Sequence, residues 1–152
     1  MAVSEYIKEK NCIMNLESSD KDGSIKEIAN KLSGQGKIKN KEKFIKDVLE
    51  REFLGSTGIG NNVAIPHART GAVKGVVIGF GKSIEGIEFK ALDGEKVNLI
   101  FLMGTDPAEL NLYLRILADL SKLLMNNSFR QALLLVNTPA EVIETIKRFE
   151  KR

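Results

Sequence analysis

The chain has 152 residues, a formal net charge of +3 and a hydrophobic fraction of 43%, which is the composition of one ordinary globular domain with a real core. Acidic and basic residues are interspersed, and this argues against a nucleic-acid-binding protein, which would need a dense basic patch. The nearest candidate, residues 37–43, is predicted to be a solvated loop and helix start. We therefore expect a single domain over residues 1–152 with no nucleic-acid partner.

The expected compartment is the cytoplasm. Cys12 is the only cysteine, so no disulfide can form within the chain, and we expect a buried structural thiol. Residues 1–10 lack the apolar stretch of a signal peptide. The longest apolar runs, residues 99–103 and 132–136, are far shorter than the about 20 residues that a membrane span needs.

The first third of the chain is predicted to contain a strand and two helices. Residues 11–16 alternate as a strand does, and Ser24 to Glu27 form a capping-box pattern at the start of a helix. Gly34 and Gly36 are predicted to end that helix, and a second helix is expected over residues 41–52.

The rest of the chain is predicted to contain short buried strands followed by helices. The glycines of residues 53–62 predict an irregular loop, and Asp106-Pro107 and Thr138-Pro139 are each typical of a helix start. The first of these two helices is apolar nearly all round, so it is expected to lie deep in the fold. Further elements are strands at 63–65, 76–80 and 97–103, a turn at 92–95 and a short helix at 129–135. This order predicts one mixed sheet with helices on its faces, an α/β (α+β) fold, and argues against a regular Rossmann-type alternation.

The glycine-rich segment has the spacing Gly55-x-x-Gly58-x-Gly60. It matches neither the dinucleotide fingerprint nor the Walker A loop. Backbone N–H groups and the hydroxyls of Ser56 and Thr57 can face an anion in such a turn, although the spacing alone favours a plain loop.

His67 is the only histidine of the chain, so any imidazole chemistry belongs to it alone. Pro66 precedes it, and we expect the chain to leave strand geometry at this point, next to the glycine loop. Arg51 and Arg69 add positive charge nearby in the sequence. A neutral imidazole surrounded by hydrogen-bond donors and cations is suited to carrying a phosphoryl group.

Two other uses of His67 are weaker, and a histidine without a role is the ordinary alternative. As a hydrolase base, His67 would act on Ser56 or Thr57, but no G-x-S-x-G elbow is present. With one histidine and one cysteine, the sequence does not favour a metal site.

Residues 54–68, Leu-Gly-Ser-Thr-Gly-Ile-Gly-Asn-Asn-Val-Ala-Ile-Pro-His-Ala, resemble the active-site signature of the IIA domains of the bacterial phosphotransferase system. The resemblance is to the fructose/mannitol branch, which includes the nitrogen-regulatory IIA proteins. Arg51-Glu52 upstream, and the strand at 97–102 leading into a leucine-rich helix, fit the same pattern.

The resemblance implies that His67 accepts a phosphoryl group from the carrier protein HPr and passes it to a cysteine of a IIB domain. No metal or organic cofactor takes part. The family arginine that matches Arg51 would steady the phosphoryl group, and we expect Thr57, Asn61 and Tyr113 to support it as well. The family fold is a three-layer α/β/α sandwich around a small mixed sheet.

The chain departs from the family pattern at two positions. Tyr113 stands where many members have a second histidine, and Asn61 stands where mannitol-type members have an acid. We therefore expect a fructose-type phosphocarrier, with a nitrogen-regulatory IIA protein as the alternative. Leu54, Ile59 and Val63 are candidates either for an apolar rim that receives HPr and IIB or for the core.

Overall fold

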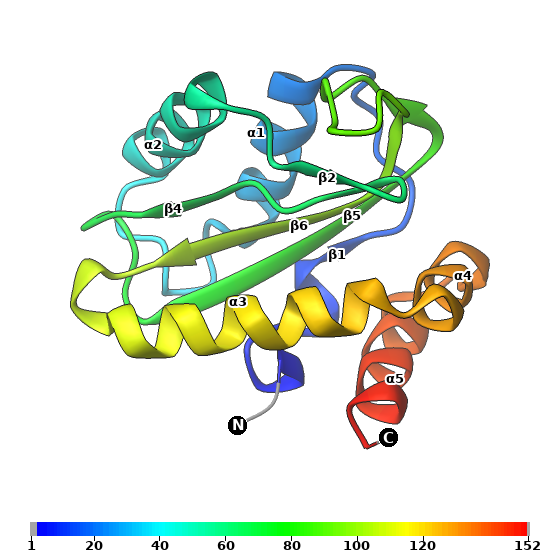
Figure 1. Cartoon of the computed structure of the whole chain (residues 1–152). Helices are drawn as coiled ribbons and strands as arrows, with labels where there is room; N and C mark the ends of the chain where they lie inside the picture. The colour runs from blue at the N-terminus through cyan, green and yellow to red at the C-terminus, as the bar shows by residue number, and fades with distance from the viewer. Residues whose placement is uncertain (1–2, 152) are drawn as a thin grey trace.

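The computed structural model describes residues 3–151 and forms three layers, with a β-sheet between two groups of helices (Figure 1). Helices α1 (Lys21–Leu32) and α2 (Lys41–Leu54) cover one face of the sheet. Helices α3 (Leu110–Met125), α4 (Asn127–Leu135) and α5 (Pro139–Glu150) lie on the other side. The three-layer α/β/α arrangement expected from the sequence is confirmed.

The sheet has six strands in the order β1-β5-β6-β3-β2, with β4 also paired to β6. The β5–β6 and β2–β3 pairs are antiparallel, whereas β1–β5, β3–β6 and β4–β6 are parallel, so the sheet is mixed as predicted. The strands are β1 (Cys12–Ile13), β2 (Gly58–Gly60), β3 (Val63–Ala64), β4 (His67–Arg69), β5 (Val76–Ile87) and β6 (Val97–Thr105).

Both faces of the central strands are buried, which explains their continuous apolar sequences. Along β6, Leu99, Phe101 and Met103 belong to the core shared with α3, α4 and α5. Ile100 and Leu102 belong to the core shared with α1 and α2. Burial of each such side chain stabilises the fold by about 1.5–3 kcal/mol. Strand β6 therefore contributes to both cores.

The N-terminal part contains less strand than predicted. Residues 11–16 were expected to form one strand, but β1 has only Cys12 and Ile13, because Asn11 ends a 3-10 turn. The other 3-10 turns are Val3–Glu5 and Pro107–Glu109. Cys12 is buried as expected, and burial raises the pKa of its thiol to about 12. No helix within residues 3–151 is long and apolar enough to cross a membrane.

The start of α1 differs from the predicted capping box. Asp20 is the N-cap, and its Oδ1 accepts the Gly23 N–H at 2.6 Å. Ser24 lies within the first turn, where its hydroxyl donates to the Lys21 carbonyl at 2.8 Å. The prediction failed because Asp20, four residues before Ser24, provides the side-chain cap of the helix. The helix ends before Gly34, which has a positive φ, as predicted.

The glycine-rich segment is more regular than predicted. Helix α2 continues to Leu54, and Gly58–Gly60 form β2, which pairs with β3. Asn61 and Asn62, both with positive φ, make the tight turn between these strands. Asparagine tolerates that conformation better than most residues, so the turn closes a hairpin where the glycines alone indicated only a loop.

Helix α3 does not lie deep in the fold, contrary to the prediction. It is an outer-layer helix with a single buried stripe, and Leu114 on its outer side is 52% exposed. Leucine is a good helix former as well as a core residue, so a leucine-rich sequence does not show how many faces are covered. The buried positions are Tyr113, Ile116, Leu120 and Leu124.

We predict that Gly104→Ala destabilises the fold by about 1–3 kcal/mol, the usual cost of overpacking a core. A Cβ on Gly104 would lie 2.8 Å from Phe44 Cε1 and 3.0 Å from Val73 Cγ2. Chemical denaturation measures the change. Gly71→Ala is the matched control, because a Cβ there meets no atom within 4 Å. Equal stability of the two variants would contradict this account of the packing.

Candidate functional site

His67 is the first residue of β4, so the chain resumes strand pairing at this residue and does not leave it as predicted. The edge next to β6 consists of two short parallel pieces, β3 and β4, separated by Ile65 and Pro66. Pro66 has no N–H, but its carbonyl accepts the Met103 N–H at 3.0 Å. The gap therefore leaves the register intact, and His67 is held opposite Met103.

The imidazole of His67 has a defined tautomer. Its Nδ1 lies 2.8 Å from the carbonyl oxygen of Ile65. A carbonyl can only accept a hydrogen bond, so Nδ1 carries the proton and Nε2 keeps its lone pair. Nε2 is therefore the nitrogen available as a nucleophile.

The surroundings of the ring keep it neutral at neutral pH. Burial lowers the pKa of His67 and is the largest effect. The hydrogen bond to Ile65 raises the pKa, the positive charge of Arg51 lowers it, and the carboxylate of Glu52 raises it. The net direction is downward, which favours the unprotonated, nucleophilic ring.

His67 lines an open cleft of about 890 Å³ between α2, β4 with its following turn, and the start of α3. Tyr113 of α3 lies on the same cleft, with its ring centroid 6.0 Å from that of His67. Arg51 and Lys43 of α2 are also on its wall. The ammonium group of Lys43 is paired with Asp47 at 2.9 Å.

Two guanidinium groups flank the cleft. Arg51 donates from Nη1 to the carbonyl of Gly55 at 2.9 Å. Arg69 follows His67 by two residues in the same strand, so both side chains leave the same face of the sheet. The guanidinium carbon of Arg69 lies 5.8 Å from the Tyr113 ring centroid. Within the described chain neither arginine forms an ion pair, so both charges are available to an anion.

Of the residues expected to support a phosphoryl group, Arg51 and Tyr113 lie on the cleft with His67, whereas Thr57 and Asn61 do not. Thr57 is buried, and its hydroxyl donates to Glu52. Asn61 lies in the β2–β3 turn, and its N–H donates to Asp93 at 3.0 Å. Thr57 is therefore directed into the protein, and Asn61 is an exposed turn residue outside the cleft.

The hydroxyls proposed for a hydrolase are also engaged elsewhere. Ser56 donates to the Phe89 carbonyl at 2.5 Å, and Thr57 donates to Glu52. Neither hydroxyl is hydrogen-bonded to His67, so the nucleophile–base pair of a hydrolase is not assembled here. Among residues 3–151 no three histidine, cysteine or acidic side chains are grouped as metal ligands.

Arg69 and Glu52 are residues near the imidazole to which the sequence assigned no role in the site. Arg69 was predicted only as a nearby charge, because the strand was expected to end at His67. Had the strand been predicted to start at His67, Arg69 would have been placed on the same face as His67, because residues two apart in a strand share a face. Glu52 was noted only as part of the Arg51-Glu52 pattern, because burial of a helical carboxylate depends on the loop that folds over it.

The apolar residues near the site separate into surface and core. Leu54 is 82% exposed and lines the cleft together with exposed Phe53. Ile59 is also exposed, whereas Val63 is fully buried. Leu54 and Ile59 therefore remain candidates for a rim, and Val63 belongs to the core.

Comparison with known proteins identifies one family. The model of the family described as "Phosphoenolpyruvate-dependent sugar phosphotransferase system, EIIA 2" matches residues 5–149. The chain is 33% identical over 151 residues to the fructose-specific EIIABC component of Bacillus subtilis (strain 168). That match covers 99% of this chain and 24% of the relative, so the chain spans about a quarter of that protein.

Two further matches cover most of both proteins. The fructose-specific EIIA component of Haloferax volcanii is 34% identical over 114 residues, which is 75% of this chain and 74% of the relative. The crystal structure of the nitrogen regulatory protein IIA-Ntr from Neisseria meningitidis superposes with a TM-score of 0.88 at 28% identity. The superposition covers 95% of this chain and 98% of the Neisseria meningitidis chain.

We predict that His67 titrates with a midpoint below its ordinary value of 6.5, because burial opposes the charged ring. Arg51→Gln is expected to raise that midpoint, since protonation would no longer place a second positive charge next to the guanidinium. Nuclear magnetic resonance follows the single imidazole directly. Arg148→Gln, on α5, is the control and should leave the midpoint at the wild-type value. A midpoint at or above 6.5 in the wild type would refute the prediction.

Proposed function

Since the chain belongs to the EIIA 2 family of the phosphoenolpyruvate-dependent sugar phosphotransferase system, a family of phosphocarriers, we propose that His67 is the residue that carries the phosphoryl group. The observation that supports this most directly is the hydrogen bond from Nδ1 of His67 to Ile65. It leaves Nε2 unprotonated on a cleft that also contains the guanidinium groups of Arg51 and Arg69.

In the first step the lone pair of Nε2 attacks the phosphorus of the phosphohistidine of HPr. A new N–P bond forms as the donor N–P bond breaks, and the electron pair of that bond returns to the HPr imidazole. The Nδ1 proton stays in place, so the phosphorylated ring is positively charged and the Ile65 carbonyl stabilises it.

In the second step the thiolate of a IIB cysteine attacks the same phosphorus. The S–P bond forms, the Nε2–P bond breaks, and its electron pair returns to Nε2 to restore the neutral ring. No proton enters or leaves the imidazole in either step, so the residue can load and unload with a single tautomer. Such a carrier would act in the cytoplasm, between HPr and IIB.

Arg51, Arg69 and Tyr113 support the phosphoryl group in this proposal. Guanidinium groups bind phosphoryl oxygens through charge-assisted hydrogen bonds, and Arg51 and Arg69 both line the cleft of the histidine. The phenol of Tyr113 adds a donor close to the ring, at the position expected for a second imidazole. Exposed Phe53 and Leu54 provide an apolar rim for HPr and IIB.

Sugar transport of the fructose type is the favoured role, because the two curated relatives above are fructose-specific components. A regulatory role is the second candidate, and it is favoured by the close superposition on IIA-Ntr over nearly the whole chain. Both roles use the same phosphorylated histidine. They differ in the partner protein: a IIB domain that accepts the phosphoryl group, or a protein that is regulated.

We predict that the wild-type chain acquires acid-labile phosphate when incubated with labelled phosphoenolpyruvate, enzyme I and HPr, whereas His67→Gln does not. Glutamine keeps a polar side chain but has no nucleophilic nitrogen. Thermal unfolding of both proteins checks that the variant is folded. Equal labelling of the two proteins, or no labelling of the wild type, would refute His67 as the phosphoryl carrier.

We further predict that the phosphorylated chain passes its label to a fructose-type IIB domain and that Cys→Ser in that domain abolishes the transfer. A thiolate accepts the group, whereas a serine hydroxyl is far less nucleophilic at neutral pH. Gel separation of the two proteins measures the transfer. Label that stays on His67 with every IIB tested, together with phosphorylation-dependent binding to a regulator, would favour the regulatory role.

A further inference from the structure

Glu52 is a buried carboxylate that joins three parts of the structure. It follows Arg51 in α2 and is only 5% exposed. Its Oε1 accepts the Thr57 N–H at 3.0 Å and also the Thr57 hydroxyl. Its Oε2 accepts the ammonium group of Lys21, from the start of α1, at 2.9 Å. The carboxylate is therefore paired with one ammonium group and holds the loop after α2 in place.

The hydrogen bonds continue from this carboxylate to the imidazole. The carbonyl of Thr57 accepts the Ile65 N–H at 3.1 Å. The carbonyl of Ile65 accepts the Nδ1 proton of His67 at 2.8 Å. Lys21, Glu52, Thr57, Ile65 and His67 thus form an unbroken series from α1 to the candidate nucleophile.

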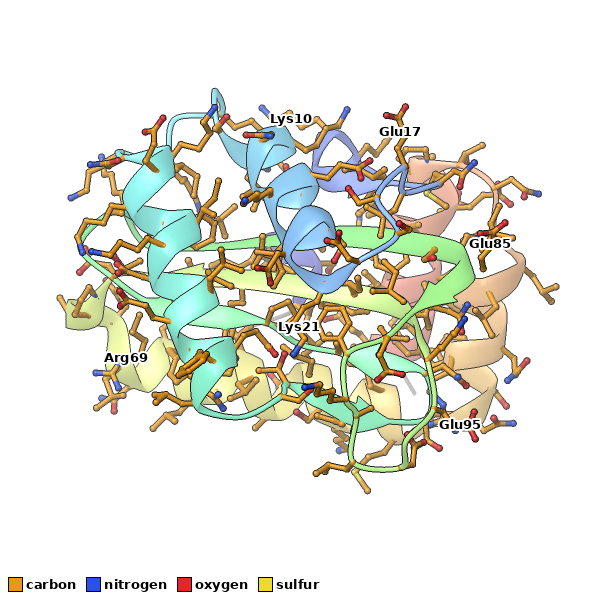
Figure 2. The ribbon with its side chains drawn as sticks, turned by 90° about the horizontal axis from the view of Figure 1, so that it is seen from above. Lys10, Glu17, Lys21, Arg69, Glu85 and Glu95 are labelled. Atoms are coloured by element: carbon orange, nitrogen blue, oxygen red, sulfur yellow. The ribbon has the colours of Figure 1, made fainter. Side chains whose placement is uncertain are left out.

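The two ends of this series lie in different places. In Figure 2 the labelled Lys21 and Arg69 lie on opposite sides of α2, and Arg69 is on the strand of His67. Helix α2 supplies both Arg51, which lines the cleft, and Glu52, which is buried next to Lys21. Neighbouring residues of a helix point in directions about 100° apart. Arg51 can therefore face the cleft while Glu52 faces Lys21.

Ile65 lies in the irregular segment that precedes the histidine. It lies between β3 and β4, where the regular pairing with β6 is interrupted. Its N–H donates to Thr57 of the neighbouring segment, and the next residue, Pro66, has no N–H to donate. The orientation of the Ile65 carbonyl therefore depends on how firmly Thr57 is held.

We propose that Glu52 is a positioning residue for phosphoryl transfer, which holds Thr57 and, through Ile65, sets the tautomer and direction of the His67 imidazole. The proposal rests on the proposed function of His67. The loop that Glu52 holds also contains Gly55, whose carbonyl accepts a hydrogen bond from the Arg51 guanidinium at 2.9 Å.

Charge supports the same role. The Glu52 carboxylate raises the pKa of His67, whereas Arg51 lowers it. Phosphorylation of Nε2 with Nδ1 still protonated makes the ring positive, and a buried negative charge nearby stabilises that state. Glu52 therefore acts on the ring through both geometry and charge.

The first test is Glu52→Gln, which keeps the shape and removes the charge. We expect a lower titration midpoint for His67, a smaller fraction of the Nδ1–H tautomer in ¹⁵N spectra, and a fall in kcat for acceptance from phospho-HPr. Because a reacting group misplaced by a fraction of an ångström reacts more slowly, we expect kcat to fall on the order of ten-fold, with KM for HPr unchanged. Glu144→Gln is the matched control, because it removes one carboxylate charge from an exposed position on α5, away from the cleft of His67.

The second test uses Thr57 and does not depend on Glu52→Gln being folded. Thr57→Val keeps the side-chain shape and the backbone N–H but removes the hydroxyl that binds Glu52. We expect a fall in kcat and a smaller Nδ1–H fraction, while Thr57→Ser restores both towards the wild type. Thermal unfolding is recorded for each variant.

Unchanged tautomer and kcat in Glu52→Gln and Thr57→Val would overturn the proposal. A lower kcat with an unchanged tautomer and titration midpoint would overturn it too, because Glu52 would then only stabilise the fold. The spectra are recorded on unphosphorylated protein. If the wild type accepts no phosphate, the proposed function fails, while the spectra still decide whether Glu52 holds the imidazole.

Discussion

Strand β6 is the element on which the rest of the structure depends. It is buried on both faces, pairs with β5 along one edge, and pairs with β3 and β4 along the other. Its apolar side chains connect the core under α1 and α2 to the core over α3, α4 and α5. Since His67 is paired with Met103 of this strand, the candidate nucleophile is attached to a central strand that is buried on both faces.

The interruption of the edge at Ile65 and Pro66 gives the site its chemistry. The Pro66 carbonyl accepts the Met103 N–H of β6, and the Ile65 carbonyl before it is directed to the Nδ1 proton of His67. The imidazole therefore has one defined tautomer, and burial lowers its pKa. Arg51 and Glu52, neighbours on α2, act on it with opposite charges from the cleft and from the interior.

Much of the fold was predictable from local patterns, and the errors have identifiable causes. The apolar runs of β5 and β6 and the proline-marked helix starts require only neighbouring residues to be recognised. The start of the first helix was predicted too late in the sequence, because Asp20 and not Ser24 is its N-cap. The β2–β3 hairpin was missed because its turn uses two asparagines with positive φ. Helix α3 was placed too deep because leucine content does not show which faces are covered.

The amino-acid sequence by itself indicated the family and singled out His67 as the candidate site residue, because a single imidazole after a long glycine-containing signature is a local pattern. It also indicated Arg51 and Tyr113, which lie on the cleft of His67. Only the tertiary structure decided that Thr57 is turned away from the cleft to Glu52, and that Arg69 shares the face of His67. The physical reason is that these placements depend on strand register and on hydrogen bonds between residues of different elements, which no local pattern of residues encodes.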